Sequence, residues 1–437
     1  MSGPLKVGIV GLGTVGQGVV RVLQKNAAAI AARAGRAIVV TDVSVRNAAA
    51  SRDCSLAGIR VHATPEAVVA ADVDVICELI GGTDLANDLI LAALAGGKSV
   101  VTANKALIAE KGNALIADAQ ARGLSLSFEA AVAGGIPIIK VLREGLTANA
   151  IDSLAGIING TSNYILTQMT VKGQSFADAL KDAQKLGYAE ADPTFDVEGI
   201  DAAHKLTILA SIAFGTPLNF AAVATEGLSK VQAQDIQLAR ELGYRIKSLG
   251  IAKRSEQGVE LRVHPTLVPD DHLLAKTDGA LNAVRVHGNA VGQTVYVGRG
   301  AGGEPTASAV IADLVDIARL NGARPVVPAL GFTAAALAAQ PTPFPILGIE
   351  EIESAYYLRL TVADEPGVLR ALTTILADAD ISVEAILQKE PEDHEDARIA
   401  IITSVVSGSR FDAALERIRA LPFVRADISR LRVEHFE

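Results

Sequence analysis

The sequence predicts an α/β protein whose N-terminal part is a doubly wound parallel sheet. Two observations lead to this fold class: short β-branched runs alternate with helical runs rich in alanine and leucine, and a glycine-rich turn follows the first run. The expected strands are LKVGIVG, RAIVVTDVSV, DVDVICELI, KSVVTA and LSLSFEA, with helical runs such as NDLILAALAGG and GNALIADAQARG between them. This alternation covers residues 1–150 and predicts one parallel sheet.

The glycine-rich turn, Gly11-Leu12-Gly13-Thr14-Val15-Gly16, lies between strand Lys6–Val10 and the helical run QGVVRVLQKN. A strand before and a helix after are the context in which a GxGxxG motif indicates a dinucleotide site of the Rossmann type. Gly11 permits the tight turn, Gly13 lets a pyrophosphate approach the backbone amides, and Gly16 allows close packing of helix on strand. The alternative is a plain strand-to-helix turn.

The end of the second strand reads Val45-Arg46-Asn47, where a site specific for NAD usually places an acid against the ribose hydroxyls. The acid is missing. Arg46, with help from Arg52, is suited to accept a 2′-phosphate instead. We therefore expect NADP(H) to be preferred, with NAD(H) possible. An exposed loop arginine without a ligand is the alternative.

Two further segments follow later strands of this sheet. VVTANKALIA places Thr102 and Lys105 beyond a strand's carboxyl end, where open parallel sheets bind ligands; a surface lysine at a helix start is the alternative. FEAAVAGGIPII places Glu129 before Gly134 and Pro137, and such a crowded backbone exposes carbonyls that, with one carboxylate, suit a hard cation. From residue types alone, a tight structural turn fits this segment better.

Residues 183–205, AQKLGYAEADPTFDVEGIDAAHK, gather five carboxylates ahead of one lysine and run into the stretch 200–214. That stretch is apolar around most of its circumference, which predicts a buried helix. Its first turn carries Asp201 and Lys205, and the i, i+4 spacing puts both on one face. Because burial of an unpaired ionised lysine is costly, the pair either stabilises a buried corner or holds an amine ready for proton transfer. A solvated acidic loop is the alternative.

From about residue 150 the alternation gives way to mixed strands and helices, with helices expected at 162–171 and 175–186, which predicts a second, α+β domain. GAGGEPTASAVIADLVDIARL then indicates a glycine turn that opens a long helix, suited to pack back on the first domain. The stretch 338–350 holds closely spaced prolines and is typical of a linker. From about Ser354, a separate strand and helix series is long enough for a small domain.

The composition describes a globular protein with a sizeable core: 437 residues, of which 50% are hydrophobic and 20% charged. A chain of this length usually forms two or three domains. The net charge of -9 argues against nucleic acid or anionic membranes as partners, and no apolar run is long enough to span a bilayer. With no recognisable targeting segment, and only Cys54 and Cys77, a cytoplasmic location is expected. Cys77 is expected to be a buried thiol.

Together these segments resemble the homoserine dehydrogenase family, whose members interconvert L-homoserine and L-aspartate 4-semialdehyde in threonine, methionine and isoleucine biosynthesis. The resemblance covers the chain to about residue 340, and TANKALIA, EAAVAGGIP, GIINGTSNYIL and GAGGEPTASAV match in the family's order. It is most specific at Ala183, Gly187, Tyr188, Asp192, Pro193, Asp196, Gly199, Asp201 and Lys205. The alternatives are another Rossmann oxidoreductase of a small amino-acid aldehyde or keto acid, and a sensor without turnover. The spacing of these carboxylates and the two lysines disfavours both.

The resemblance implies a role for each candidate residue. Lys205 is implied as the proton donor to the carbonyl oxygen, Lys105 as a second active-site lysine, and Glu190 and Asp201 as ligands of the substrate. Cofactor contacts are implied at Gly13, Thr14, Val15, Arg46, Lys105, Gly187 and Gly303, beside the expected contacts at Gly11, Gly16 and Thr102. A monovalent cation, usually sodium, is implied near Glu129, Val132, Gly134 and Ile136.

The segment YYLRLTVADEPGVLRALTTILADADISVEAILQKE resembles an ACT domain, a small amino-acid-sensing module of βαββαβ order, through the turn at Asp364, Pro366, Gly367 and Val368. This resemblance implies feedback control by L-threonine, a downstream product; a role only in oligomerisation is the alternative. A homo-oligomer, dimer or tetramer, is expected. The expected parts are a Rossmann dinucleotide-binding domain (1–150), a catalytic and dimerisation domain (151–300), a helical return onto the first domain (301–340), a linker (341–354) and an ACT regulatory domain (355–437).

Overall fold

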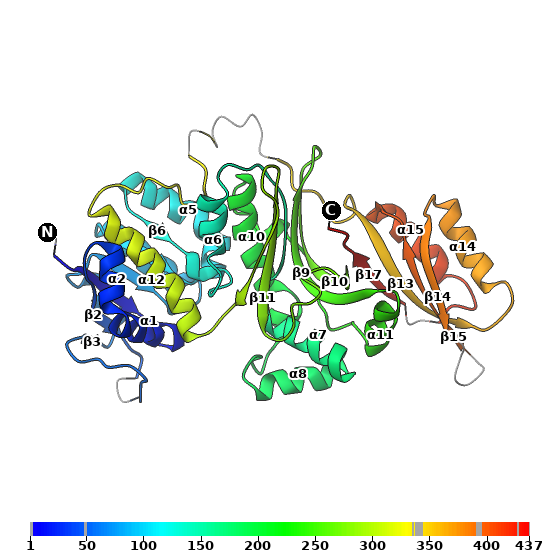
Figure 1. Cartoon of the computed structure of the whole chain (residues 1–437), viewed down its shortest axis with the longest axis horizontal. Helices are drawn as coiled ribbons and strands as arrows, with labels where there is room; N and C mark the ends of the chain where they lie inside the picture. Colours follow the sequence, from blue (N-terminus) through cyan, green and yellow to red (C-terminus); the bar gives the residue numbers. More distant parts are fainter. Residues whose placement is uncertain are drawn as a thin grey trace. The chain divides into compact units, whose positions relative to one another are not determined.

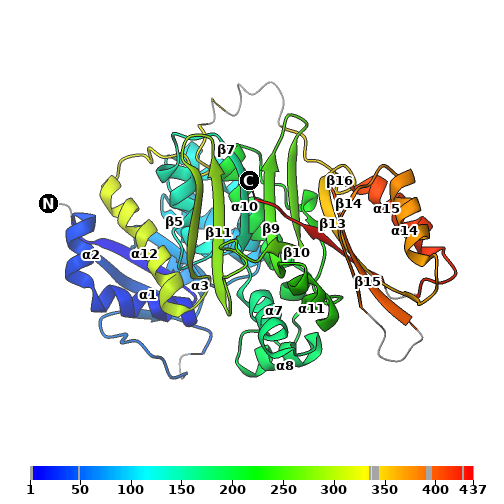
Figure 2. The same ribbon diagram turned by 45° about the vertical axis from the view of Figure 1, so that its right-hand side comes forward.

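The computed structural model describes residues 3–47, 50–333, 336, 344–389, 396–425 and 428–436. Figures 1 and 2 label its helices and strands in chain order. The chain forms two compact units, each made of separate stretches of sequence. The first unit comprises residues 1–154, 204–221 and 286–343, and the second comprises 155–203, 222–285 and 344–437.

The first unit contains a parallel six-stranded sheet of order β3-β2-β1-β4-β5-β6. Its strands are β1 (Leu5–Val10), β2 (Ile38–Ser44), β3 (Arg60–His62), β4 (Val75–Glu78), β5 (Ser99–Thr102) and β6 (Leu126–Ser127). The strand order changes direction between β1 and β4, at the topological switch point where such sheets bind dinucleotides. The predicted doubly wound sheet is confirmed.

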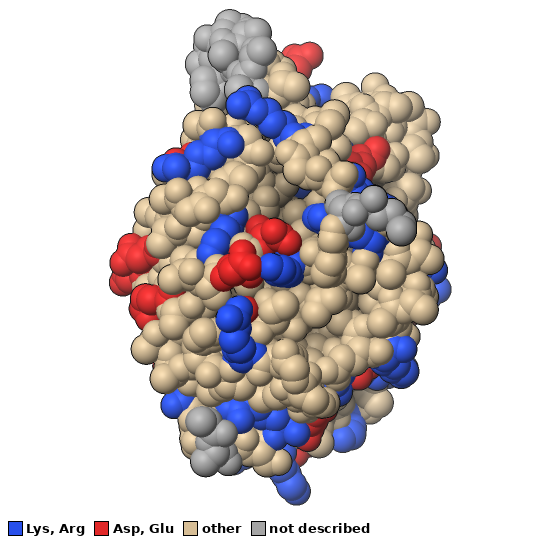
Figure 3. Space-filling view, turned by 90° about the vertical axis from the view of Figure 1, so that its left-hand side faces the viewer, with Lys and Arg blue, Asp and Glu red and all other residues tan. Residues whose placement is uncertain are grey.

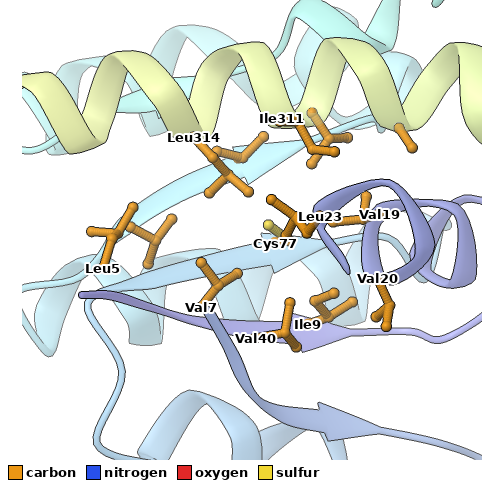
Figure 4. Close-up of a cluster of buried hydrophobic side chains, with 14 of the residues drawn as sticks. Leu5, Val7, Ile9, Val19, Val20, Leu23, Val40, Cys77, Ile311 and Leu314 are labelled. Atoms are coloured by element: carbon orange, nitrogen blue, oxygen red, sulfur yellow. The ribbon is translucent and has the colours of Figure 1, made fainter. Parts of the chain in front are cut away.

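Helices cover both faces of this sheet. They are α1 (Thr14–Lys25), α2 (Ala27–Ala34), α3 (Pro65–Ala70), α4 (Asp84–Ala95), α5 (Lys105–Arg122) and α12 (Gly303–Leu320). Helices α1, α2 and α12 lie side by side (Figure 1) and share one hydrophobic core with the strands. Figure 4 shows Leu314 of α12 facing the strands that carry Val7 and Cys77, and the predicted buried thiol is confirmed. On the opposite face, Gly8 lies against Val68 of α3.

Shorter elements complete the first unit. They are the 3₁₀-helix η1 (Glu129–Ala131), α6 (Ile138–Lys140), the π-helix η2 (Val141–Gly145), the 3₁₀-helix η3 (Phe220–Ala222) and β12 (Gly292–Arg299). Three elements contain residues of both units: β7 (Ile151–Ile157), α10 (Ile200–Phe214) and β11 (Leu281–Gly288). Nearly every residue of α10 is buried, which confirms the helix predicted at 200–214.

The second unit begins with helices and a long hairpin. Its elements here are α7 (Gly160–Lys172), α8 (Phe176–Lys185), α9 (Thr194–Val197), β8 (Ala224–Thr225), α11 (Ala233–Glu241), β9 (Tyr244–Arg254) and β10 (Val259–Pro269). Helices α7 and α8 lie where helices were predicted, and the side chains of Asn159 and Ser175 cap their N-termini. Strands β9 and β10 pair antiparallel along their full length.

The C-terminal part of the second unit has the predicted βαββαβ order. Its elements are β13 (Glu353–Ala363), α14 (Val368–Asp378), β14 (Val383–Lys389), β15 (Asp396–Thr403), the short β16 (Val406–Ser407), α15 (Gly408–Arg419) and β17 (Ser429–Val433). The strands form an antiparallel sheet of order β17-β13-β15-β14. Both helices pack on one face of these strands (Figure 2).

The other face of these C-terminal strands packs on the helices of the same unit. Tyr357 and Ile402 share a hydrophobic core with Ile165 of α7 and Leu238 of α11. Strand β17 also pairs in parallel with β10, so the two groups of strands form one continuous sheet. The predicted boundary between a 151–300 and a 355–437 domain stays a prediction, but both segments contribute to this one compact unit.

Buried ion pairs hold this junction. The Glu434 carboxylate accepts a hydrogen bond from the Arg262 guanidinium (2.9 Å) and pairs with Lys253. Arg359 of β13 pairs with Asp235 of α11 at 2.7 Å, with both side chains buried. Burial raises the pKa of Glu434, but the charges of Arg262 and Lys253 outweigh it and hold this pKa below its usual value.

The linker predicted at 341–354 lies partly outside the described residues, which resume at Phe344. From there the chain follows β10: the Val259 amide donates to the Pro345 carbonyl and the Leu347 amide donates to the Val259 carbonyl. On the face shown in Figure 3, acidic and basic side chains are interspersed. Within the described part of the chain, none of the helices has the length and apolar character needed to cross a membrane.

We expect Glu434→Gln to destabilise the protein by about 1.5–3 kcal/mol at neutral pH, because the buried Arg262 loses a charged hydrogen-bond partner and keeps only Glu260 as an acidic one. Urea unfolding measures this. Since the folded-state pKa of Glu434 lies below its unfolded value, the difference between wild type and variant should shrink as pH falls through the folded pKa. As a control, Glu416→Gln removes an exposed pair with Arg419 and should have little effect. Equal stability of wild type and Glu434→Gln would contradict the prediction.

Candidate active site

The glycine turn after β1 is tight on one side and open on the other. Gly11 has φ +96°, and a Cβ on Gly16 would collide with the Gly11 carbonyl. The helix α1 therefore packs on the turn only because this residue is glycine. At Gly13, a Cβ would meet no described atom within 4 Å. The turn thus leaves open space at the helix N-terminus, where backbone amides favour a phosphate.

A second helix N-terminus lies beside the first. A Cβ on Gly18 of α1 would be 2.5 Å from the Gly303 carbonyl oxygen, and a Cβ on Gly303 would be 3.0 Å from the Thr14 carbonyl oxygen. Thr14 is exposed and Val15 is half-buried. The structure therefore brings Gly303, far away in sequence, to the glycine turn, and the two helix N-termini together favour an anion.

The end of β2 is hydrogen-bonded to the same turn. The Ser44 hydroxyl accepts a hydrogen bond from the Gly11 amide (3.2 Å). Arg46 follows two residues later and is exposed. The acid within β2, Asp42, is occupied elsewhere, because its carboxylate lies 2.7 Å from His62 Nε2. Arg46 is thus the first charged side chain after the end of β2.

The ends of β4 and β5 form a hydrogen-bonded network next to the turn. The Thr102 hydroxyl donates to the buried Glu78 carboxylate (2.6 Å) and accepts from the Asn104 amide (2.9 Å). Glu78 also accepts from the Gly81 amide (3.3 Å). Asn104 caps α5, whose first residue is the half-buried Lys105. Sequence reasoning missed Glu78, although a carboxylate at the end of an apolar strand is a usable signal.

Glu129 is buried with its carboxylate on backbone amides. Its oxygens accept from the amides of Ile139 (3.0 Å) and Lys140 (2.9 Å), and its own amide donates to Asp313 (2.9 Å). Burial, and then the Asp313 charge, raise the pKa of Glu129 to about 8. Burial raises the pKa of Asp313 to about 6. This pair of buried carboxyl groups is an environment that a cation would stabilise in its ionised form.

The other residues of the predicted cation site lie in the same turn. Val132, Gly134 and Ile136 are buried between η1 and α6, and Ala133 between them has φ +47°. The described residues contain no group of three or more His, Cys, Asp or Glu side chains suited to a metal. A cation here would therefore depend mainly on backbone carbonyl oxygens, which hard monovalent ions accept.

In the second unit, Asn159 joins two carboxylates of the 183–205 segment. Its amide donates to Asp196 (2.7 Å) and to the buried Asp201 (2.8 Å), while its carbonyl oxygen accepts from the Ser162 amide at the N-terminus of α7. The Ser162 hydroxyl donates to the Asp196 carbonyl (3.0 Å). Asn159 belongs to GIINGTSNYIL but was given no role from the sequence, because nothing in that motif shows which carboxylates it will meet.

The loop after α8 carries the remaining candidates of this unit. Gly187 has φ +76°, and both it and the Glu190 side chain are exposed. The Thr161 hydroxyl donates to the Tyr188 carbonyl (2.7 Å), and Gln184 donates to the Glu190 carbonyl (3.0 Å). The loop is therefore attached through its backbone, which leaves the Glu190 carboxylate directed to solvent.

Helix α10 carries Asp201 and Lys205 one turn apart, as predicted. Asp201 is buried and Lys205 is half-buried. Between them, the buried His204 lies 3.2 Å from Glu110 and stacks on Phe220 with ring centroids 4.1 Å apart. These contacts fix the rotation of α10 about its axis, and so fix the direction of Lys205.

The site residues predicted from the sequence are thus divided between the two units. The first unit holds Gly11, Gly13, Thr14, Val15, Gly16, Arg46, Thr102, Lys105, Glu129, Val132, Gly134, Ile136, Lys205 and Gly303. The second holds Gly187, Glu190 and Asp201. Within the first unit, the glycine turn, Gly303, Thr102 and Lys105 lie at the carboxyl ends of β1, β4 and β5 or at the helix starts that follow.

A glycine turn at the switch point of a doubly wound sheet is typical of NAD(P)-dependent oxidoreductases. Residues 11–129 match the model of the homoserine dehydrogenase NAD-binding domain, 137–315 that of homoserine dehydrogenase, and 356–423 that of the ACT domain. The chain is 53% identical to the homoserine dehydrogenase of Pseudomonas aeruginosa over 99% of both chains. It belongs to the homoserine dehydrogenase family.

Solved structures agree with this family assignment. The homoserine dehydrogenase of Thiobacillus denitrificans is 54% identical, covers 99% of each chain and superposes with a TM-score of 0.92. A hyperthermophilic archaeal homoserine dehydrogenase in complex with NADPH is 25% identical with a TM-score of 0.60, over 74% of this chain and 99% of its own. The fold and the oxidoreductase class expected from the sequence are therefore confirmed.

We expect Asn159→Ala to lower stability by about 1–3 kcal/mol, because the buried Asp201 loses a hydrogen-bond donor. Turnover should fall as well, since α10 and the loop lose their connection. Chemical unfolding and steady-state kinetics measure both effects. Asn87→Ala, which removes only a weak 3.4 Å contact with Asp88, is the matched control. Wild-type stability and kcat in Asn159→Ala would show that the hydrogen bonds from Asn159 to Asp196 and Asp201 are dispensable.

Proposed function

We propose that this chain interconverts L-homoserine and L-aspartate 4-semialdehyde with Lys205 as the group that moves the proton. The observation that carries this assignment is the pair on the first turns of α10: Asp201 is held by Asn159, and Lys205 follows on the same face. When bound, the nicotinamide cofactor supplies or accepts the hydride.

The chemistry assigns different tasks to the two side chains. Reduction of the aldehyde places negative charge on its oxygen, and the Lys205 ammonium stabilises this charge and donates the proton. In the oxidative direction, the neutral amine takes the proton from the hydroxyl. Asp201 and the exposed Glu190 are suited to bind the ammonium group of the amino-acid substrate. Lys105, at the start of α5, is proposed to contact cofactor or substrate.

We expect Lys205→Ala to lower kcat by roughly 10²–10⁴-fold, because general acid catalysis typically contributes this much. Binding of NADP⁺, measured by calorimetry, should be retained, since Lys205 acts on the substrate oxygen. Lys172→Ala, at the exposed end of α7, is the control. If Lys205→Ala turns over at a rate near that of the wild type, the proton-transfer assignment is wrong.

We propose a preference for NADP(H), supported by the exposed Arg46 at the end of β2 and by the occupied carboxylate of Asp42. A charged hydrogen bond to a phosphate contributes about 1.5–3 kcal/mol. Arg46→Ala should therefore raise the KM for NADPH roughly tenfold or more and change the KM for NADH little. Comparison of kcat/KM for both cofactors in wild type and variant measures this. A wild-type preference for NADH would reject the proposal.

A monovalent cation, such as sodium, is proposed at the turn of Glu129, Val132, Gly134 and Ile136. The buried turn and the raised pKa of Glu129 support this, because a bound cation would offset the cost of ionising that carboxyl group. The residues of the turn fit a hard ion of low charge better than a transition metal, since they include neither histidine nor cysteine. The cation would order the segment that leads into α6.

Threonine control through the C-terminal βαββαβ part is proposed, with Gly367 in the turn that begins α14.

A homo-oligomer is also proposed, supported by the exposed Val297 on β12, the end strand of its sheet. The two cysteines are free thiols, which supports a reducing, cytoplasmic location. The division at 150, 300, 340 and 354 remains part of this proposal.

Gly367→Asp should abolish inhibition by L-threonine and leave basal kcat within about twofold, because φ +99° strains any side chain at this turn. Titration of activity with threonine measures the effect. A point variant is preferred to deletion of the C-terminal part, whose strands share a core with α7 and α11. Gly35→Asp, at a φ of +80° in the first unit, is the matched control. Unchanged threonine inhibition in Gly367→Asp would remove this role.

A further inference from the structure

A cavity of about 490 Å³ lies in the first unit at the C-terminal ends of α5 and α12. Gly123 and Leu126 line it on one side, Leu320 and Arg324 on another, and Arg143 also contributes. The glycine turn lies at the other end of α12, about 25 Å away along the helix. The cavity is thus separate from the nucleotide-binding end of the sheet.

The walls of this cavity are largely apolar. Besides Leu126 and Leu320, they include Ile116, Pro325 and Val326. Val326 is 86% exposed at the rim, which is unusual for a large aliphatic side chain on a protein surface. A volume of this size with apolar walls is typical of sites for small organic molecules.

Among the described residues, one arginine of the cavity lacks an acidic partner. Arg143 pairs with Glu144 (2.8 Å), and Arg319 pairs with Asp316 (3.3 Å). The Arg324 side chain, in contrast, makes no hydrogen bond or ion pair with the part of the chain that the structure describes. The site therefore has an excess of positive charge at its rim.

Two backbone features border the cavity beside these arginines. Arg324 packs against Gly123, where an added Cβ would lie 2.9 Å from Arg324 Nε. Arg143 is buried and lies in the π-helix η2, a rare conformation that occurs frequently at functional sites. Gly123 also ends α5 in the left-handed conformation, with φ +70°, so this glycine serves the end of the helix as well as the contact with Arg324.

We propose that this cavity binds a small organic anion whose apolar body fills the hollow and whose charged head meets Arg324. Recognition would combine burial of the apolar body against Leu126, Leu320 and Val326 with a charge-assisted hydrogen bond from the guanidinium. The proposal does not depend on the catalytic roles given above, because none of those residues lines the cavity.

Anilinonaphthalene sulfonate, an apolar anion that fluoresces when bound, is a direct probe. The full chain is titrated with it while NADP⁺ occupies the nucleotide site. We expect saturable binding of one probe per chain, weakened tenfold or more by Arg324→Gln and by Val326→Asp. Both residues are exposed, so the fold should persist, and the melting temperature checks this. Lys230→Gln, an exposed cation in the second unit, should bind the probe like wild type.

Equal affinity in wild type, Arg324→Gln and Val326→Asp would overturn the proposal. The same conclusion follows if no saturable binding remains with NADP⁺ present. A probe stoichiometry that falls as protein concentration rises would show that a second copy of the chain covers the rim, and would also overturn it.

Discussion

The amide of Asn159 is the contact on which the arrangement of Asp196, Asp201 and the start of α7 depends. It stands between two carboxylates that would otherwise repel each other and donates one hydrogen bond to each. Because the same side chain caps α7, the start of one helix, a loop and the start of another are fixed together. Lys205 then takes its direction from α10, whose rotation is set by His204. The role proposed for the Lys205 amine thus rests on an uncharged residue several contacts away.

In the nucleotide-binding part, the structure depends on the close approach of α1 to the glycine turn and to α12, which is a steric constraint. Glycines at positions 11, 16 and 18 remove the atoms that would separate α1 from the turn and from α12. The approach of α12 brings a second helix N-terminus to the same place and completes the core over β1 and β4. A segment from far along the chain therefore contributes to the core of the first sheet and brings a second helix N-terminus to the glycine turn.

Local patterns in the sequence predicted many of the helices and strands and the dinucleotide motif. A stretch that is apolar around most of its circumference predicted helix 200–214 with its exact bounds, and strand, glycine turn and helix located the dinucleotide motif, because these signals depend on near neighbours. Long-range partners were not predictable in the same way. Asn159 meets Asp201 across 42 positions, and Arg262 meets Glu434 across 172. Pairing of β17 with β10 needs only two compatible edges, which many strands offer, so no pattern in the sequence selects it.

The pairing of β17 with β10 also has a consequence for biosynthesis. The second unit cannot complete its sheet, or pair Arg262 with Glu434, until residues 429–434 have left the ribosome. Strand β8 pairs with β10 at Arg262 and Val263, but the edge at Thr266 and Leu267 has no partner strand until β17 has been translated. A chain that stalls or is clipped a few residues early would expose that edge. Unpaired strand edges promote aggregation, so such a chain would become a target for chaperones and proteases.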